Sequence, residues 1–246
     1  FRGEKICSRN GIFMIFHRRL SFAETGTRSW CRRWKNRGVF TIVEHLIFGI
    51  ILRNGESSRR NIGAGRMNDR QIAFIMCVND DRQADESEFY IRCLEVPEQY
   101  EVDVIRVREA ESMTAGYNAA MENSDARYKV YLHQDTRIIA PGFIRDMINV
   151  FKNDDTIGML GCVGCRKLPA NGQAVGHWDA GMVYHNCIPG MLTLEQDKEQ
   201  QPVEVEALDG LLLATSRDVR WREDLFDGWD FYDVSQCLEM RRMGWR

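Results

Sequence analysis

The sequence has no hydrophobic run long enough to cross a membrane. Its longest apolar run, Val39–Leu52, has 14 residues and contains Glu44 and His45, whereas a membrane-spanning helix needs about 20 apolar residues. Glycine-rich loops of the Gly-x-x-x-x-Gly-Lys and Gly-x-Gly-x-x-Gly kinds are also missing. The sequence therefore offers neither of these two phosphate-binding loops.

Cysteine pairs that would indicate a zinc or redox site are scarce. Cys162 and Cys165 have the Cys-x-x-Cys spacing, but no second pair lies near them in the sequence. Cys77, Cys93 and Cys237 stand in apolar surroundings, which is typical of core cysteines in a reducing compartment. We therefore expect a cytoplasmic protein, with the inner face of the membrane as an alternative location.

Charge is distributed unevenly along the chain, which the net charge of -3 does not show. Only the first 66 residues have an excess of basic side chains. Residues 1–66 carry 14 Lys/Arg against 4 Asp/Glu, and the rest carries 19 against 32. Because residues 1–66 also lack sustained periodicity, we expect a disordered or non-native extension, with a membrane anchor or nucleic-acid arm as alternatives. Residues 67–246 form the predicted domain, and their acidic balance argues against nucleic acid as a partner.

Strand and helix patterns alternate after Met67. Continuous or alternating apolar runs predict strands, and 3.6-residue spacing with Ser, Thr or Pro near the start predicts helices. The predicted strands are 71–78, 100–109, 128–138 and 156–164, and the predicted helices are 86–97, 112–124 and 141–154. This order predicts an α/β fold with a Rossmann-like, mainly parallel sheet and helices on both faces.

Polar residues follow three of these strands directly. Asn79 and Asp80 end the first, Glu109 ends the second, and His133 and Asp135 end the third. Ligands of such sheets sit at the carboxyl ends of the strands, and grouped carboxylates repel one another unless a cation lies between them. A Mg²⁺ or Mn²⁺ ion bridging a diphosphate fits this edge. The alternative is that each aspartate only caps a turn or helix.

A second group of polar residues lies near the end of the chain. Asp209 and Gly210 precede an apolar strand, and Asp233 falls in the first turn of a predicted helix. A carboxylate there stabilises the helix electrostatically. It is also oriented and partly exposed, as a general base requires. Spacing alone does not choose between these two roles.

Three segments in this order resemble family 2 glycosyltransferases of the GT-A fold. They are "ESMTAGYNAAMENSDARYKVYLHQDTRI", "LDGLLLATSRDV" and "FDGWDFYDVSQCLEMRRMGWR". The first is similar to the family's small-residue helix and the strand that delivers its Asp-x-Asp metal motif. The resemblance runs from about Gln71 to the end of the chain and is strongest to the StrF-type group. The family's chain normally continues further, so we expect a domain truncated at its C-terminus.

The resemblance implies roles for single residues on the donor side. Asp135 takes the last position of the Asp-x-Asp motif and contacts the metal and the sugar diphosphate. His133 stands where the first Asp usually is. Gly116 and Asn118 match positions lining the nucleotide pocket, and Asn79 and Asp80 match the loop around the base.

On the acceptor side, Asp233 matches the acid that deprotonates the acceptor hydroxyl, and Tyr232 replaces the family's preceding Glu. The segments that resemble the family here contribute Asp209, Gly210, Trp229 and Asp230. The implied activity is an inverting transfer from a UDP- or dTDP-type sugar to a glycan, lipid-linked or protein acceptor.

The residues are also compatible with two other classes of protein. A nucleotidyltransferase shares this sheet and its carboxyl-edge acids but needs a basic glycine-rich loop after the first strand, where "VNDDRQADESE" is acidic. A non-catalytic binding domain agrees with the departures at His133 and Tyr232. The sequence does not identify the oligomeric state.

Overall fold

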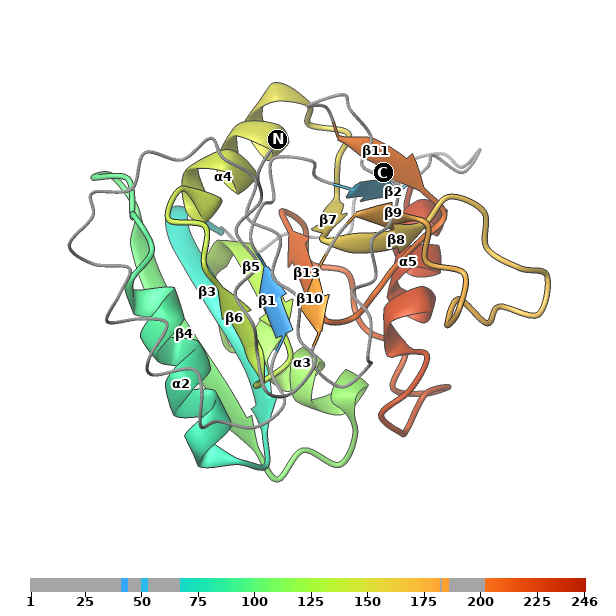
Figure 1. The fold of residues 1–246 in the computed structure, drawn as a ribbon, viewed down its shortest axis with the longest axis horizontal. Helices are drawn as coiled ribbons and strands as arrows, with labels where there is room; N and C mark the ends of the chain where they lie inside the picture. The colour runs from blue at the N-terminus through green and yellow to red at the C-terminus, as the bar shows by residue number, and fades with distance from the viewer. Residues whose placement is uncertain (1–40, 44–49, 53–66, 182, 186–201) are drawn as a thin grey trace, which may run out of the picture.

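The computed structural model describes residues 41–43, 50–52, 67–181, 183–185 and 202–246 (Figure 1). Four helices are present in these residues. They are α2 (Asp81–Arg92), α3 (Met113–Glu122), α4 (Phe143–Asn153) and α5 (Tyr232–Arg242).

Seven strands form the central sheet, in the spatial order β11-β2-β7-β13-β5-β3-β4. They are β2 (Ile50–Leu52), β3 (Asn68–Val78), β4 (Glu101–Arg108), β5 (Ala126–Leu132), β7 (Met159–Gly161), β11 (Val203–Val205) and β13 (Leu212–Thr215). Two smaller sheets have the orders β10-β1-β6 and β12-β8-β9. Their strands are β1 (Thr41–Val43), β6 (Thr136–Ile138), β8 (Val163–Cys165), β9 (Ala180–Gly181), β10 (Tyr184–His185) and β12 (Ala207–Leu208).

The strands expected from the sequence to be parallel share one direction. β4, β3 and β5 are parallel neighbours, and β13 runs antiparallel between β5 and β7, so β7 points the same way as β5. Beyond β7, β2 is antiparallel to it and β11 is parallel to β2. This mixed, mostly parallel sheet, with helices on both faces, confirms the predicted GT-A, Rossmann-like fold class.

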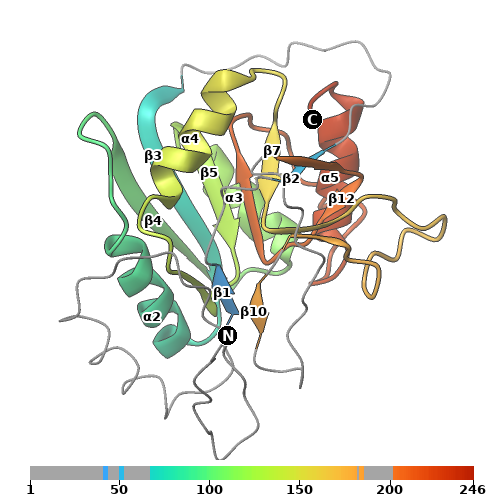
Figure 2. The ribbon, with the colours of Figure 1, turned by 45° about the horizontal axis from the view of Figure 1, so that its top comes forward.

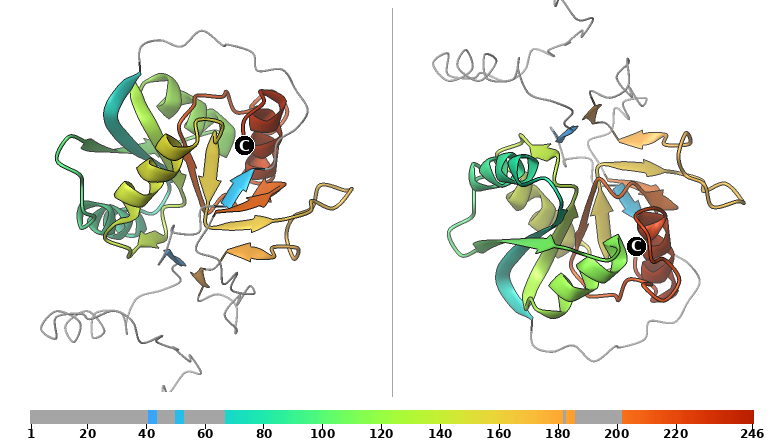
Figure 3. Two further views of the ribbon diagram at one scale, coloured as in Figure 1. Left: turned by 90° about the horizontal axis from the view of Figure 1, so that it is seen from above. Right: turned by 90° about the horizontal axis from the view of Figure 1, so that it is seen from below.

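Side chains of β3 show how one strand serves two cores. Ile72, Phe74 and Met76 are fully buried in the cluster covered by α2 and α4. Ala73 and Ile75 alternate with them and join the cluster covered by α3 and α5. Side chains on a strand alternate between faces, so a strand buried on both faces reads as one continuous apolar run. Figures 2 and 3 show the two helix pairs on opposite sides of the sheet.

Three elements differ most from those expected. Helix α2 begins at Asp81, earlier than the predicted 86, because the Asp80 carboxylate accepts from the N–H groups of Arg82 and Gln83. The predicted strand 128–138 is divided into β5 and β6 by a turn in which Thr136 N donates to His133 O over 3.0 Å. Strand 156–164 is likewise divided into β7 and β8.

The chain ahead of the domain is described only in part. β1 pairs with β6 and β10, and β2 pairs with β7 and β11. The other residues of 1–66 lie outside the described residues, so the expectation for that segment stays a prediction. None of the helices described is both long and apolar enough to cross a membrane.

A buried ion pair joins β5 to the segment after β13. The Lys129 side chain is fully buried, and its Nζ contacts both carboxylate oxygens of Asp218, at 2.9 and 3.0 Å, and the carbonyl of Ala126 at 2.7 Å. A buried ammonium needs such partners. The pair therefore holds the chain after β13 against β5.

The expectation of core cysteines holds for Cys162, Cys165 and Cys237, which are buried, but it is wrong for Cys93, which is exposed at the C-terminal end of α2; Cys77 is partly buried. Cys162 and Cys165 are both buried, and Cys165 Sγ donates to the carbonyl of Lys167. Burial raises the pKa of both thiols, which disfavours the thiolate that redox and metal chemistry require. The prediction of core cysteines is confirmed for this pair.

Candidate functional site

The carboxyl ends of three parallel strands bring the predicted donor residues to one edge of the sheet. Asn79 and Asp80 follow β3, Glu109 follows β4, and His133 and Asp135 follow β5. β13 begins at the same edge, because Leu212 is the register partner of Leu132. The start of β13 therefore brings Asp209 and Gly210 beside the end of β5.

Gln134 binds the end of β5 to the loop after β3. Its Oε1 accepts from the backbone N–H groups of Asn79 and Asp80, each at 3.0 Å, and its Nε2 donates to Asn79 Oδ1. Arg137 in turn donates to the Gln134 carbonyl at 3.3 Å and to Glu86 at 3.5 Å. The middle residue of the predicted Asp-x-Asp position is thus the one that holds the two strand ends together.

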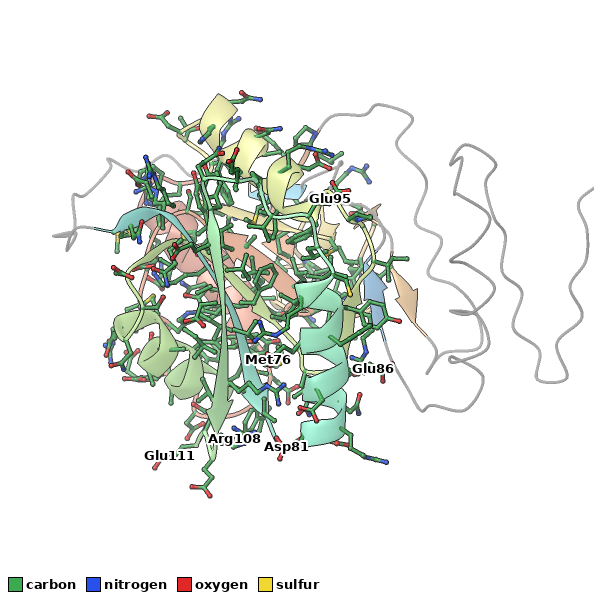
Figure 4. The ribbon with its side chains drawn as sticks, turned by 90° about the vertical axis from the view of Figure 1, so that its left-hand side faces the viewer. Met76, Asp81, Glu86, Glu95, Arg108 and Glu111 are labelled. Carbon is green, nitrogen blue, oxygen red and sulfur yellow. The ribbon has the colours of Figure 1, made fainter. Side chains whose placement is uncertain are left out.

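The acids at this edge have different surroundings. Asp80 caps α2, so its Oδ1 accepts from the N–H groups of Arg82 and Gln83, and its Oδ2 lies 3.7 Å from Arg82 Nη2. Asp81 pairs with Arg108 at 2.6 Å across the ends of α2 and β4, and the two lie close together in Figure 4. Asp135 is half-buried, and no group in the described parts of the chain donates a hydrogen bond to its carboxylate. Asp135 therefore has both oxygens left for a ligand, as does Glu109 among the described residues, but Glu109 is exposed at the rim.

His133 contacts the start of helix α5. Its Nε2 lies 2.6 Å from the hydroxyl of Tyr232, and its backbone N–H donates to the Leu211 carbonyl at 3.1 Å. The Tyr232 hydroxyl also presses against Gly210, where a Cβ would lie only 2.1 Å from it. The ends of β5, β13 and α5 thus meet at these side chains.

Asp233 is held at this meeting point by backbone donors. Its Oδ2 accepts from Gly210 N at 2.9 Å and its Oδ1 accepts from Val234 N at 2.8 Å. Burial raises the pKa of Asp233 to about 6, and the nearby carboxylate of Asp209 adds to the rise. At neutral pH this carboxylate is mostly ionised and more basic than an ordinary aspartate, which suits a general base.

Asp209 stabilises the turn into β13. Its Oδ1 accepts from Leu211 N at 2.8 Å, and its own N–H donates to Val163 O at 2.9 Å. Trp229 and Asp230 are exposed on the loop before α5. That loop is tied to α3 because Met113 N donates to the Gly228 carbonyl at 3.1 Å.

Two residues predicted to line the nucleotide pocket, Gly116 and Asn118, have close packing contacts in the structure. Gly116 is buried, and a Cβ there would lie 2.6 Å from Cys77 Sγ. Asn118 is also buried, and its amide bonds the backbone of Trp221 in both directions and donates to Glu223 at 2.9 Å. Both positions secure α3 against the sheet and the 221–223 segment. A direct nucleotide contact by either residue stays a prediction.

Glu109 is exposed at the rim of the site in a left-handed backbone conformation, with φ of 56°. Phe231, directly before Tyr232, has φ of 61° and is also exposed. Left-handed conformations of non-glycine residues cost energy and cluster at functional sites. The two described residues of this kind both flank the candidate site.

Gln134 and Tyr232 are the residues that sequence reasoning undervalued. Gln134 stood only as the variable residue between two motif positions, and Tyr232 only as a missing acid. The polar sequence directly after β5 was a signal for Gln134, since three polar residues in succession at a strand end need partners. The contact between Tyr232 and His133 spans 99 residues, and local patterning contains no trace of it.

The profile of the glycosyltransferase-like family matches residues 73–246, which include every site residue described above. The chain belongs to this glycosyltransferase-like family. No curated protein sequence matches the chain.

One solved structure similar to this glycosyltransferase-like chain is the mannosyltransferase PcManGT from Pyrobaculum calidifontis in complex with GDP-Man and Mn²⁺. The TM-score is 0.46 at 14% sequence identity, and the likeness covers 89% of this chain and 59% of that one. This chain thus spans about three fifths of the length of that mannosyltransferase.

Proposed function

We propose that this chain transfers a sugar from a nucleoside-diphosphate sugar, of the UDP or dTDP type, to an acceptor hydroxyl with inversion at the anomeric carbon. The observation that carries the proposal is the setting of Asp233. This ionised carboxylate of raised pKa is held by Gly210 N–H at the carboxyl edge of the sheet. Membership of the glycosyltransferase-like family supports the reaction class.

Asp233 is the proposed base. As the acceptor oxygen attacks the anomeric carbon, its proton passes to a carboxylate oxygen of Asp233, and the bond from that carbon to the diphosphate oxygen breaks on the opposite face. Each oxygen of Asp233 accepts one backbone hydrogen bond, so each keeps a free lone pair for the proton. The reaction needs no covalent enzyme intermediate.

Asp135 is the proposed protein ligand of a Mg²⁺ or Mn²⁺ ion. The described residues contain no group of three His, Cys, Asp or Glu side chains that is able to hold a metal ion. One free carboxylate still fits such an ion, since Mg²⁺ is commonly bound by one or two carboxylates, waters and the substrate's phosphates. When bound, the cation would neutralise the charge that develops on the leaving diphosphate.

The proposal also includes the subfamily, the donor sugar class, the acceptor and the location of the protein. The His133 departure favours the StrF-type group of family 2, and hexosyl donors fit that group. The acceptor is proposed to be a glycan, a lipid-linked molecule or a protein, met on the side of Trp229 and Asp230. The proposed location is the cytoplasm, including the inner face of the membrane, because the cysteines that the structure describes are free thiols.

Calorimetric titration of the full chain with UDP, dTDP and GDP, each with and without Mn²⁺, tests the donor site. We expect metal-dependent binding that Asp135→Ala abolishes. Asp155→Ala is the matched control, because Asp155 is exposed just before β7, at the opposite edge of the sheet. Equal binding by the Asp135 variant and wild type would remove Asp135 from the proposal.

The variant Asp233→Asn separates an enzyme from a binding domain. We expect it to lose transfer by about 10²-fold or more, the usual contribution of a general base, while its affinity for nucleoside diphosphate stays within about threefold. Unchanged transfer would exclude Asp233 as the base. A wild-type protein that binds the diphosphate and transfers no sugar from a donor panel would favour the binding-domain alternative.

A further inference from the structure

The contact between His133 and Tyr232 joins the donor side of the site to the acceptor side. His133 lies at the end of β5, two residues before Asp135, and Tyr232 is the first residue of α5, directly before Asp233. Their side chains meet at 2.6 Å although 99 residues separate them. The hydrogen bond therefore spans the two halves of the proposed machinery.

Tyr232 is fixed from several directions. Its side chain is 4% exposed, and its ring lies 5.9 Å from the ring of Tyr117 and 6.1 Å from that of Trp221, measured between centroids. Its hydroxyl occupies the space that a side chain at position 210 would need. Burial raises the pKa of Tyr232 well above its usual range, so the hydroxyl stays neutral and serves as a hydrogen-bonding group.

The residue before Tyr232 makes this anchor necessary. Phe231 is the N-cap residue of α5, has a left-handed conformation and makes no capping hydrogen bond with its side chain. Such a conformation costs about 1–3 kcal/mol and persists only where the surroundings hold it in place. The buried ring and hydroxyl of Tyr232 follow directly and hold the turn, which places Asp233 against Gly210.

The chemistry of the pair also suits its position. Asp135, Asp209 and Asp233 already make this edge acidic, and two further carboxylates in contact at positions 133 and 232 would repel each other without a proton or cation between them. An imidazole and a neutral hydroxyl make the same connection with no added negative charge. The connection is thus independent of a bound metal.

We propose that His133 and Tyr232 act as a pair of positioning residues, whose hydrogen bond keeps the base Asp233 in register with the strand end that carries Asp135. The proposal rests on the proposed transferase function. It assigns the pair to the rate of transfer and not to donor affinity, because the hydrogen bond sets where the base stands relative to the bound donor.

Three single variants and one double variant test the pair in the full chain. Tyr232→Phe removes only the hydroxyl, and His133→Leu removes the hydrogen-bonding nitrogen. His133→Gln restores a polar atom near the place of Nε2 and serves as the conservative control. The double variant His133→Leu/Tyr232→Phe tests whether the two side chains act as a unit.

We expect Tyr232→Phe and His133→Leu each to lower kcat by about 10- to 100-fold, as small misplacements of reacting groups do. The KM of Tyr232→Phe for the donor and its Kd for UDP with Mn²⁺ are expected to stay within about threefold of wild type. His133→Gln should recover most of the lost kcat, and the double variant should be no slower than the slower single variant. An unchanged kcat in Tyr232→Phe, additive losses in the double variant, or equal losses in both His133 variants would overturn the proposal.

Hydrogen exchange of the peptides covering 207–213 and 231–238 is a readout that does not require turnover. We expect faster exchange in Tyr232→Phe and His133→Leu than in wild type, and protection close to wild type in His133→Gln. This pattern in a protein that transfers no sugar from any donor would mean that the transferase proposal fails while the connection stands. If wild type transfers sugar and hydrogen exchange is equal in all variants, the transferase proposal stands and the proposed connection between His133 and Tyr232 fails.

Discussion

The backbone N–H of Gly210 donates to Oδ2 of Asp233 over 2.9 Å, linking the turn before β13 to the first turn of α5. Gly210 also lies under the hydroxyl of Tyr232. One residue without a side chain therefore contacts both the proposed base and its proposed anchor. This small contact area lies on the acceptor side of the site, and the contact between Tyr232 and His133 joins it to the donor side.

The pKa of Asp233 predicts the pH dependence of transfer. Burial raises this pKa from its usual 3.8 to about 6, and the base must be deprotonated to act. We therefore expect kcat/KM to rise tenfold per pH unit well below pH 6 and to level off above about pH 7. A pH–rate profile between pH 4.5 and 8 checks this, and an acid limb centred near pH 4 would contradict the assignment.

Gly210→Ala is expected to damage both stability and activity. The added Cβ would lie 2.1 Å from the buried Tyr232 hydroxyl, and overpacking of this kind costs about 1–3 kcal/mol. Gly228→Ala is the matched control, because a Cβ at Gly228 meets no atom within 4 Å. Chemical denaturation of both variants gives the comparison. Equal free energies of unfolding would show that Tyr232 moves aside without cost.

Substitution of Gln134 is expected to lower the affinity for the donor. Gln134→Ala removes three hydrogen bonds to Asn79 and Asp80, so the loop proposed to face the nucleotide base is released from β5. We expect the Kd for UDP with Mn²⁺ to rise about tenfold, which corresponds to about 1.4 kcal/mol. In Gln134→Glu the acceptor remains but the donor to Asn79 is lost, so an intermediate Kd is expected. Wild-type affinity in both variants would show that the hydrogen bonds of Gln134 to Asn79 and Asp80 do not contribute to donor binding.

Substitution of Lys129 is expected to lower the stability of the fold strongly, away from the candidate site. Its ammonium is fully buried against Asp218, whose side chain is 31% exposed. Lys129→Met leaves the Asp218 carboxylate partly buried without its partner, and we expect the free energy of unfolding to fall by about 3 kcal/mol. The double variant Lys129→Met/Asp218→Asn should recover part of that loss. Additive losses in the double variant would show that the two side chains contribute independently.

Much of the architecture follows from local sequence patterns. The buried run Gln71–Val78 and the alternation in 100–109 predicted β3 and β4 to within a few residues. Of the two expected starts of α3, Ser112 and Thr114, Ser112 is the N-cap residue. Asp233 was also correctly expected in the first turn of α5. These features depend on side-chain periodicity and capping, which neighbouring residues determine.

The acids at the edge illustrate what a pattern leaves undecided. Asp80 and Asp135 both follow buried strands in the sequence, yet Asp80 caps α2 and Asp135 keeps its oxygens free. The difference comes from the local chain path, because a helix begins directly after Asp80, whereas Asp135 lies in the turn between β5 and β6. Backbone direction after the strand decides which carboxylate is left for a ligand.

By itself, the sequence determined the strand and helix order, the polar strand ends and the helix start at Asp233, because each of these depends on residues close together in the chain. Only the tertiary structure decided that β13 enters antiparallel beside β5, that Gln134 bridges to Asn79, and that His133 meets Tyr232. Those contacts join residues 55 to 99 positions apart. They form only when the packed core brings the strand ends together, and periodicity contains no information about such pairings.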